Sequence, residues 1–171
     1  MSDNITEVRS PNISIHPPTA FVAANLRRIL PDWNSDDVWI VIFLQRSQFP
    51  LTTTNDIIEQ EKNRLCDRFL EFAQPVAQQL NSQGWMTDII YPPSGYPLLS
   101  KPGEIHHSDA LTVATSLNLS LQKGPCTIVI HPQWGTAVYP SVLISSAPPD
   151  EINKAIDFAG YRVAPTHKPH R

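Results

Sequence analysis

The sequence holds 171 residues, the usual length of one domain and enough to bury a hydrophobic core without disulfides. With 41% hydrophobic and 17% charged residues, it lacks the low hydrophobicity and high charge of a disordered protein. The 13 Lys and Arg residues against 16 Asp and Glu residues give a net charge of −3, which argues against non-specific nucleic-acid binding. Two cysteines exclude a disulfide scaffold and a four-cysteine zinc site.

The start of the chain shows no sign of export or membrane insertion. Residues 1–18 contain charged residues and prolines but no apolar stretch like that of a signal peptide. The longest apolar run, at residues 38–44, is far shorter than the roughly 20 residues of a membrane span. We therefore expect a cytoplasmic protein with no membrane partner.

The first elements in chain order are a short strand, a helix and a buried strand. Residues 1–11 are polar and are expected to be loose, whereas apolar and polar residues alternate over residues 12–16 as in a strand. Apolar residues at helical spacing follow Pro18 and predict a helix that ends before Pro31. Residues 38–44 are apolar on both faces, which is typical of a central strand covered on both sides.

The longest helical pattern runs from about Thr54 to Gln83. Its apolar stripe consists of Ile58, Leu65, Phe69, Phe72, Val76 and Leu80. Pro75 lies within this pattern, and a proline costs about 3 kcal/mol in a straight helix interior. We therefore expect a kink or a break within a turn of Pro75, with the stripe still buried. Gly84 is expected to end the helix as its C-cap, and Cys66 to pack in the core.

Short strands and one short helix are predicted in the second half of the chain. In order, these are a strand at 85–91, a turn-rich loop at 92–97, a helix at 109–118, and strands at 126–131 and 136–145. The connection between the last two strands has hairpin length. A proline inside the final strand, Pro140, predicts a sheet edge or a bulge there.

A last helix is predicted to start at Pro148 and Pro149, where proline is tolerated. The hairpin-joined strands favour an α+β fold with a mixed, mostly antiparallel sheet and flanking helices. We expect one domain over residues 12–158, with a flexible basic tail over residues 159–171.

The residue type that most clearly suggests chemistry is a cysteine at the entrance to a predicted strand. Cys126 follows Gly124 and Pro125, and its thiolate would suit a soft or late transition metal. The alternative is a small buried hydrophobic residue that begins a strand, which is what most free cysteines are. The pair His106 and His107 lacks a third ligand at zinc spacing and is expected to lie in a solvated loop.

A second candidate region follows the strand that begins near Cys126. His131 is placed as a candidate base, and Trp134 followed by Gly135 predicts a tight turn with the indole at the sheet rim. A flat ligand or a partner could stack on such an aromatic side chain. We predict that Trp134 is partly accessible and that Cys126 is partly exposed near this turn. The sequence contains neither of the usual glycine-rich nucleotide loops.

Several stretches together resemble the C-terminal domain of the methylmalonic aciduria and homocystinuria type D protein family, the cobalamin-trafficking adaptors. The matching stretches are Glu59 to Phe69, Gly84-Trp85-Met86-Thr87-Asp88, Pro93-Ser94-Gly95, His131-Pro132-Gln133-Trp134-Gly135-Thr136, and Ala147-Pro148-Pro149-Asp150. A weaker likeness of element order extends back to about Ile13. The spacing between the Asp88 and Trp134 segments makes the resemblance specific.

The resemblance implies a nitroreductase-like α+β domain that has lost flavin chemistry and is not an enzyme. Members of this family receive cobalamin from a processing partner, and a cysteine is thought to meet the cobalt as a thiolate. For this chain it implies a non-enzymatic adaptor that contacts a cobalamin-processing protein, with a cobalamin-dependent enzyme as a further candidate partner. The residues implied to contact the transiently held cobalamin are Asp88, Cys126, His131, Trp134, Gly135 and Thr136, with Cys126 as the candidate cobalt ligand.

This sequence departs from the animal members at two positions. They carry two adjacent cysteines after a glycine, of which the first is associated with cobalt; here Pro125 stands at the first position and Cys126 matches the second. Tyr91 replaces the aspartate of the family's Asp-Pro-Ser-Ser-Gly turn. Two alternatives stay open: a relic nitroreductase-like enzyme that binds flavin near Trp134, and an interaction module without cobalt ligation.

Overall fold

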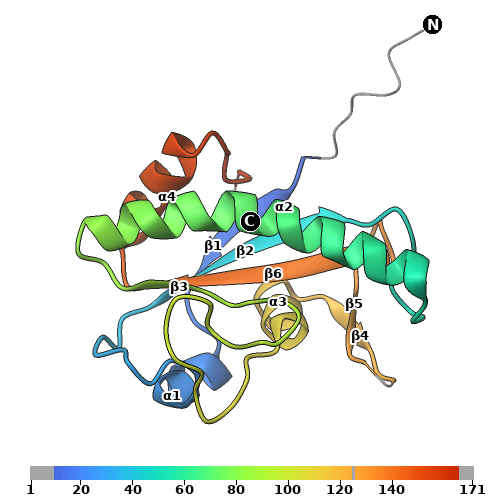
Figure 1. The fold of residues 1–171 in the computed structure, drawn as a ribbon, viewed down its shortest axis with the longest axis horizontal. Coiled ribbons are helices and arrows are strands. Elements are labelled where there is room, and N and C mark those ends of the chain that lie inside the picture. The colour runs from blue at the N-terminus through green and yellow to red at the C-terminus, as the bar shows by residue number, and fades with distance from the viewer. Residues whose placement is uncertain (1–9, 125, 166–171) are drawn as a thin grey trace, which may run out of the picture.

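The computed structural model describes residues 10–124 and 126–165 (Figure 1). The elements run β1 (Asn12–His16), α1 (Ala20–Ile29), β2 (Trp39–Arg46), α2 (Asp56–Ser82), β3 (Thr87–Ile89), α3 (Asp109–Leu117), β4 (Ser120–Gln122), β5 (Ile128–Ile130), β6 (Val138–Ser145) and α4 (Pro149–Phe158). Within this part of the chain, no helix is both long enough and apolar enough to cross a membrane.

A four-stranded antiparallel sheet forms the centre of the molecule. Its strand order is β1-β2-β6-β3, and each neighbouring pair is antiparallel. Strands β4 and β5 form a separate antiparallel pair. The α+β class and the antiparallel sheet predicted from the sequence are therefore confirmed.

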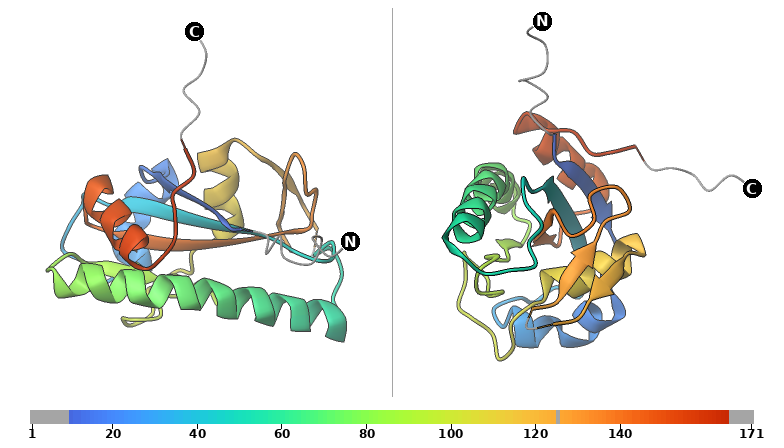
Figure 2. Two further views of the ribbon diagram at one scale, coloured as in Figure 1. Left: turned by 90° about the horizontal axis from the view of Figure 1, so that it is seen from above. Right: turned by 90° about the vertical axis from the view of Figure 1, so that its right-hand side faces the viewer.

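Helices cover both faces of the sheet (Figures 1 and 2). Helices α2 and α4 lie on one face, where Phe43 of β2 stacks on Phe72 of α2 with ring centroids 4.6 Å apart. Helices α1 and α3 lie on the other face, where Ile42 packs among their apolar residues. Successive residues of β2 thus enter opposite cores, because side chains alternate across a strand. This confirms the prediction of a central strand covered on both sides.

Helix α2 passes Pro75 without interruption, so the prediction of a break or kink there is wrong (Figures 1 and 2). The predicted apolar stripe is buried as expected. Pro75 itself is exposed, as is Glu71, the residue whose carbonyl oxygen loses its helical partner. Water can satisfy that carbonyl on the solvent face, and the ring does not enter the core. Gly84 follows the helix with φ of +92°, as a glycine at a helix end should.

Strand β6 is central, between β2 and β3, and its register with β2 continues without a bulge through Pro140, which corrects the prediction that Pro140 marks a sheet edge or a bulge. The Val142 carbonyl accepts a hydrogen bond from the Ile90 amide, so even-numbered residues of β6 direct their backbone groups toward β3. Pro140 faces the same side, but β3 pairs with β6 only along residues 143–145. Pro140 has no backbone N–H to donate, but β3 does not extend far enough to offer a carbonyl partner at this position. The lack of this donor therefore breaks no hydrogen bond between the two strands.

The last two predicted strands do not form the expected hairpin with each other. β5 pairs with β4, a strand that the sequence did not predict, and the turn after β5 carries the chain into the main sheet. Asn118, which has φ of +54° after α3, begins the reversal into β4.

The described residues after α4 pack against the domain, although we expected a flexible tail from residue 159. The ring of Tyr161 meets Phe72 edge-on, with centroids 4.9 Å apart. The Ala164 amide donates a 2.8 Å hydrogen bond to the Ile13 carbonyl of β1. Tyr161 also meets Phe43, so two aromatic contacts and a strand-edge hydrogen bond tie this segment to the sheet. Residues 1–9 and 166–171, for which we also expected looseness, lie outside the described residues.

Candidate functional site

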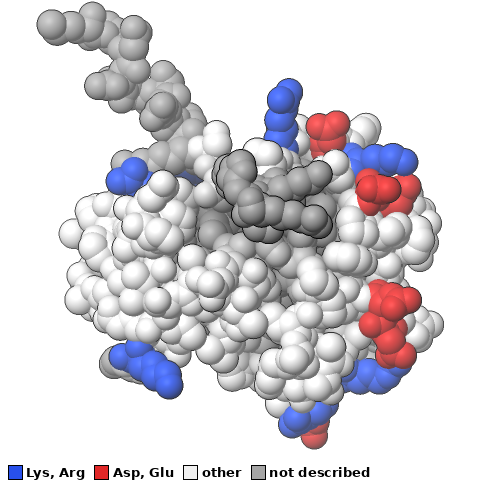
Figure 3. Space-filling view, turned by 180° about the vertical axis from the view of Figure 1, so that it is seen from behind, with Lys and Arg blue, Asp and Glu red and all other residues white. Residues whose placement is uncertain are grey.

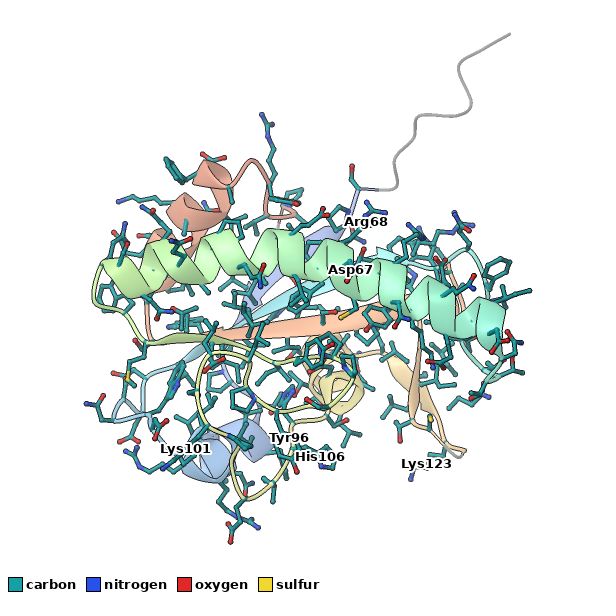
Figure 4. All side chains as sticks on the ribbon, viewed as in Figure 1. Asp67, Arg68, Tyr96, Lys101, His106 and Lys123 are labelled. Carbon is teal, nitrogen blue, oxygen red and sulfur yellow. The ribbon has the colours of Figure 1, made fainter. Side chains whose placement is uncertain are left out.

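Cys126 is exposed, as predicted, and it lines a cavity of about 520 Å³. It follows the tip of the β4–β5 hairpin, which Lys123 marks in Figure 4. The ladder between β4 and β5 covers only residues 128–130, so Cys126 lies ahead of the first paired residue. Continued alternation would place it on the face of Ile128 and Ile130, which are only partly buried, and not on the buried face of Val129. Pro125, which takes the place of the family's first cysteine, lies outside the described residues.

Three segments far apart in the sequence form the other walls of this cavity, which we call the Cys126 cavity. They are the turn at residues 92–95, the segment at residues 106–110 that begins α3, and Tyr139 with Pro140 on β6. Gly95 joins the first two, because its carbonyl accepts a 2.8 Å hydrogen bond from the His107 amide. Gly95 has φ of +74°, and a Cβ there would come within 2.5 Å of the His107 carbonyl oxygen. The close approach of these two backbones thus requires glycine.

A buried histidine and aspartate brace the start of α3. His107 is buried, with Nδ1 2.8 Å from Asp109 Oδ1 and Nε2 2.6 Å from Thr112 Oγ1. Burial raises the pKa of the Asp109 carboxyl, and the hydrogen bond from His107 opposes this rise. Because both ring nitrogens have partners, His107 is held in one orientation and offers no free nitrogen to a metal. The expected solvated loop is therefore wrong for His107, whereas His106 is exposed.

The two cysteines occupy different environments. Cys66 is buried on α2, as predicted, and burial raises the pKa of its thiol. Tyr139 packs in the same buried cluster as Cys66, and burial raises the pKa of Tyr139 far above its usual value. Tyr139 therefore presents a neutral side chain to the Cys126 cavity. Of the two thiols, only Cys126 is open to a reagent or a metal from solvent.

The Trp134 turn has the predicted geometry. Gly135 has φ of +57°, and His131 and Gly135 exchange backbone hydrogen bonds of 2.8 and 2.9 Å. Trp134 is partly exposed, and its ring stacks on His131 at a centroid distance of 4.1 Å. The Thr136 carbonyl accepts a hydrogen bond from the Leu51 amide, which ties the turn to the loop before α2.

The His131 ring is engaged within its own turn. Nδ1 accepts hydrogen bonds from the backbone amides of Gln133 and Trp134, each at 3.1 Å. A neutral imidazole that accepts at Nδ1 carries its proton on Nε2, so His131 presents a donor to the surroundings. Burial lowers the pKa of His131, which favours this neutral form. The geometry suits a hydrogen-bond donor better than a base or a metal ligand.

Asp88 lies in a third place, buried on β3. Its carboxylate accepts hydrogen bonds from the Ile89 amide at 2.8 Å, the Leu99 amide at 2.9 Å and the Ser100 hydroxyl at 2.7 Å. These bonds fasten the loop at residues 97–100 to the sheet edge. Such a geometry favours a structural role for Asp88 over contact with a cofactor.

The residues selected from the sequence thus lie in three places. Cys126 and the Trp134 turn lie before and after β5 in the chain, and Asp88 is on β3. Over residues 10–124 and 126–165, no group of three His, Cys, Asp or Glu side chains is placed to hold a metal ion. Sequence reasoning missed Tyr139 and the His107–Asp109 pair as neighbours of Cys126. The spacing of His107, Asp109 and Thr112 around a helix start was the one available signal.

Comparison with known proteins points to one family. The model of the methylmalonic aciduria and homocystinuria type D protein family matches residues 2–155. The chain is 22% identical over 124 residues to a chicken protein and 23% identical over 123 residues to a human protein, both named cobalamin trafficking protein CblD. Each alignment covers 71% of this chain but 42% of the relative, so the chain spans less than half the length of these proteins. Because the family model covers most of the sequence, the chain belongs to the methylmalonic aciduria and homocystinuria type D protein family.

Proposed function

We propose that this chain is a non-enzymatic, cytoplasmic adaptor in cobalamin metabolism that offers Cys126 as a thiolate to cobalt. The observation that carries the proposal is the exposed Cys126 thiol in the lining of a cavity. Family membership supports the link to cobalamin, because the matched relatives are named as cobalamin trafficking proteins.

The chemistry of the cavity suits one soft ligand for a metal that another protein carries. A thiolate binds soft or late transition metals, whereas the neighbouring His107 has no free ring nitrogen. In this proposal, cobalamin is cargo that a cobalamin-processing protein presents, and Cys126 occupies one axial position of its cobalt. A cobalamin-dependent enzyme would be a later recipient. The nitroreductase-like ancestry implied by the family belongs to the same proposal.

The experiment is an absorbance titration of hydroxocobalamin with the purified chain, alone and with a cobalamin-processing protein. We expect a new cobalt–sulfur absorption band when all three are mixed, and loss of that band in Cys126→Ser. Cys66→Ala is the matched control, because it removes the buried thiol and leaves Cys126 in place. A band that persists in Cys126→Ser, or a wild-type protein that gives no band, would contradict the proposal.

Thiol labelling of the native protein gives an independent check of the same site. Cys126 should react with a thiol reagent at least tenfold faster than Cys66, since its side chain is exposed and the other is buried. Mass spectrometry of the peptides assigns each label. Equal labelling of both cysteines in folded protein would remove the support that exposure gives to Cys126. Flavin absorbance in the purified protein would instead favour the relic enzyme.

A further inference from the structure

An apolar groove lies between α1 and α3, next to the Cys126 cavity. Its volume is about 780 Å³, larger than that of the Cys126 cavity. Large apolar side chains on the first turns of the two helices border it: Phe21 is 54% exposed and Leu111 is 50% exposed. Ile105 and Tyr96 line it from the loop between β3 and α3. Half-exposed apolar side chains around one hollow are typical of an interaction site.

The charges around this groove are already paired. Among the described residues that line it, Arg28 and Glu104 carry opposite charges, and their side chains are 2.8 Å apart. On the face shown in Figure 3, the visible Lys, Arg, Asp and Glu side chains lie toward the margin. An occupant that carries an unpaired charge would be left without a counter-ion and would lose hydration. The groove therefore fits an apolar, uncharged surface.

The walls of the groove are fixed before anything binds. The Ile105 amide donates a 3.1 Å hydrogen bond to the Arg28 carbonyl at the end of α1. On the other side, the His107–Asp109 pair holds the same loop against the start of α3. A preformed hollow loses little conformational entropy when it is occupied, which favours affinity.

The groove and the Cys126 cavity share two of their lining residues, His106 and Ser108. Figure 4 shows His106 beside Tyr96 below α3, on the loop that separates the two hollows. A protein that brings a metal to Cys126 therefore also reaches the groove. This continuity identifies the occupant more closely than the apolar surface alone.

We propose that the groove docks the protein that carries cobalamin, by taking an uncharged apolar segment of it while Cys126 meets the cobalt. The inference rests on the function proposed above and adds the surface on which the partner binds. A volume of about 780 Å³ accommodates a few apolar side chains, such as the anchors on one face of an amphipathic helix. Phe21 and Leu111 are the contacts that this segment covers.

The test uses Leu111→Glu and Phe21→Glu. Both residues lie in the first turn of a helix, where a carboxylate is favourable. In α3 the change also creates a capping box with Ser108, so the variant is expected to fold. Phe158→Glu is the matched control, because Phe158 is 80% exposed on α4, on the opposite side of the sheet. Affinity for a cobalamin-processing protein loaded with hydroxocobalamin is measured by calorimetry.

We expect each groove variant to weaken binding at least tenfold and Phe158→Glu to change it less than threefold. Measured with the processing protein free of cobalamin, the groove variants should still weaken binding at least tenfold, and Cys126→Ser should lose the cobalt–sulfur band, which separates docking from ligation. If Leu111→Glu weakens docking but the wild-type mixture shows no cobalt–sulfur band, the groove proposal stands and the cobalt proposal is refuted. Binding unaffected by both groove variants, or no binding by the wild-type chain, would overturn the groove proposal. The groove proposal would also be overturned if the wild-type chain dimerised and Leu111→Glu abolished the dimer, because a second copy of the chain would then occupy the groove.

Discussion

Gly95→Ala should be far more destabilising than an alanine at a second glycine that also has positive φ. At Gly95, φ is +74° and the new Cβ would come within 2.5 Å of the backbone oxygen of His107. At Gly84, φ is +92° but no atom lies within 4 Å of a new Cβ. A left-handed conformation costs a residue with a Cβ roughly 1–2 kcal/mol, and both variants incur this cost.

The clash at Gly95 adds a second contribution that Gly84 lacks. The atom in the way is backbone oxygen, held by the hydrogen bonds of Gly95 to Tyr91 and of His107 to Gly95, each 2.8 Å long. Forced overpacking typically costs about 1–3 kcal/mol. We therefore expect Gly95→Ala to lower the free energy of unfolding by about 2–5 kcal/mol and Gly84→Ala by about 1–2 kcal/mol.

Urea unfolding followed by circular dichroism measures both free energies under the same conditions. In thermal unfolding, each kcal/mol corresponds to roughly 2–4 °C in Tm for a chain of this size. Thiol labelling adds a local readout, since displacement of the His107 segment should change the reactivity of Cys126 in Gly95→Ala alone. Equal losses of stability in the two variants would refute the close backbone approach that forms this wall of the cavity.

Three further predictions follow from the core and the turns. Phe72→Ala should lower the free energy of unfolding by about 3–5 kcal/mol in urea titration, because the buried ring stacks on Phe43; a loss below 1 kcal/mol would contradict this packing. Pro75→Ala should raise Tm, because Pro75 is exposed within a continuous helix and alanine restores a helical amide; a lower Tm would show that the proline shapes the helix. The lowered pKa of His131 means that its contribution to stability is present above about pH 6.5 and is lost as the pH falls through the lower pKa of the folded state. The free energy of unfolding of the wild type should therefore decline relative to His131→Asn below that pH, whereas parallel profiles for the two proteins would rule out this linkage.

Patterns that depend on a single element were predictable from the sequence. The strand at residues 12–16 and the buried stripe of α2 were correctly placed, because alternation and helical spacing are local properties. The glycines after α2 and in the Trp134 turn were likewise identified by their need for positive φ. The exposure of Cys126 followed from its place ahead of a strand.

Features that depend on which face or partner an element meets were not predictable. Pro75 was assigned to the apolar stripe of α2, but in the structure it faces solvent, next to Val76 of that stripe. Pro140 was expected at a sheet edge or a bulge, but it lies in regular register in a central strand, beyond the residues that pair with β3. Both errors have the same cause. A proline lacks a backbone N–H, and the free energy that this costs depends on whether the surroundings would have offered that N–H an acceptor.

The surroundings of Cys126 were also beyond sequence reasoning. His107 looked like half of an exposed pair, yet tertiary packing buries it between Asp109 and Thr112. Tyr139 reaches the same cavity from β6, more than ten residues along the chain from Cys126. Contacts of this kind are set by the order of strands in the sheet, and no local pattern encodes that order.

X-ray absorption at the cobalt edge tests the central claim most directly, using hydroxocobalamin with the processing protein and this chain together. The account predicts a sulfur neighbour of cobalt in the wild-type mixture and in Cys66→Ala, and only nitrogen or oxygen neighbours in Cys126→Ser. A wild-type spectrum without sulfur, or sulfur that remains in Cys126→Ser, would contradict ligation of cobalt by Cys126.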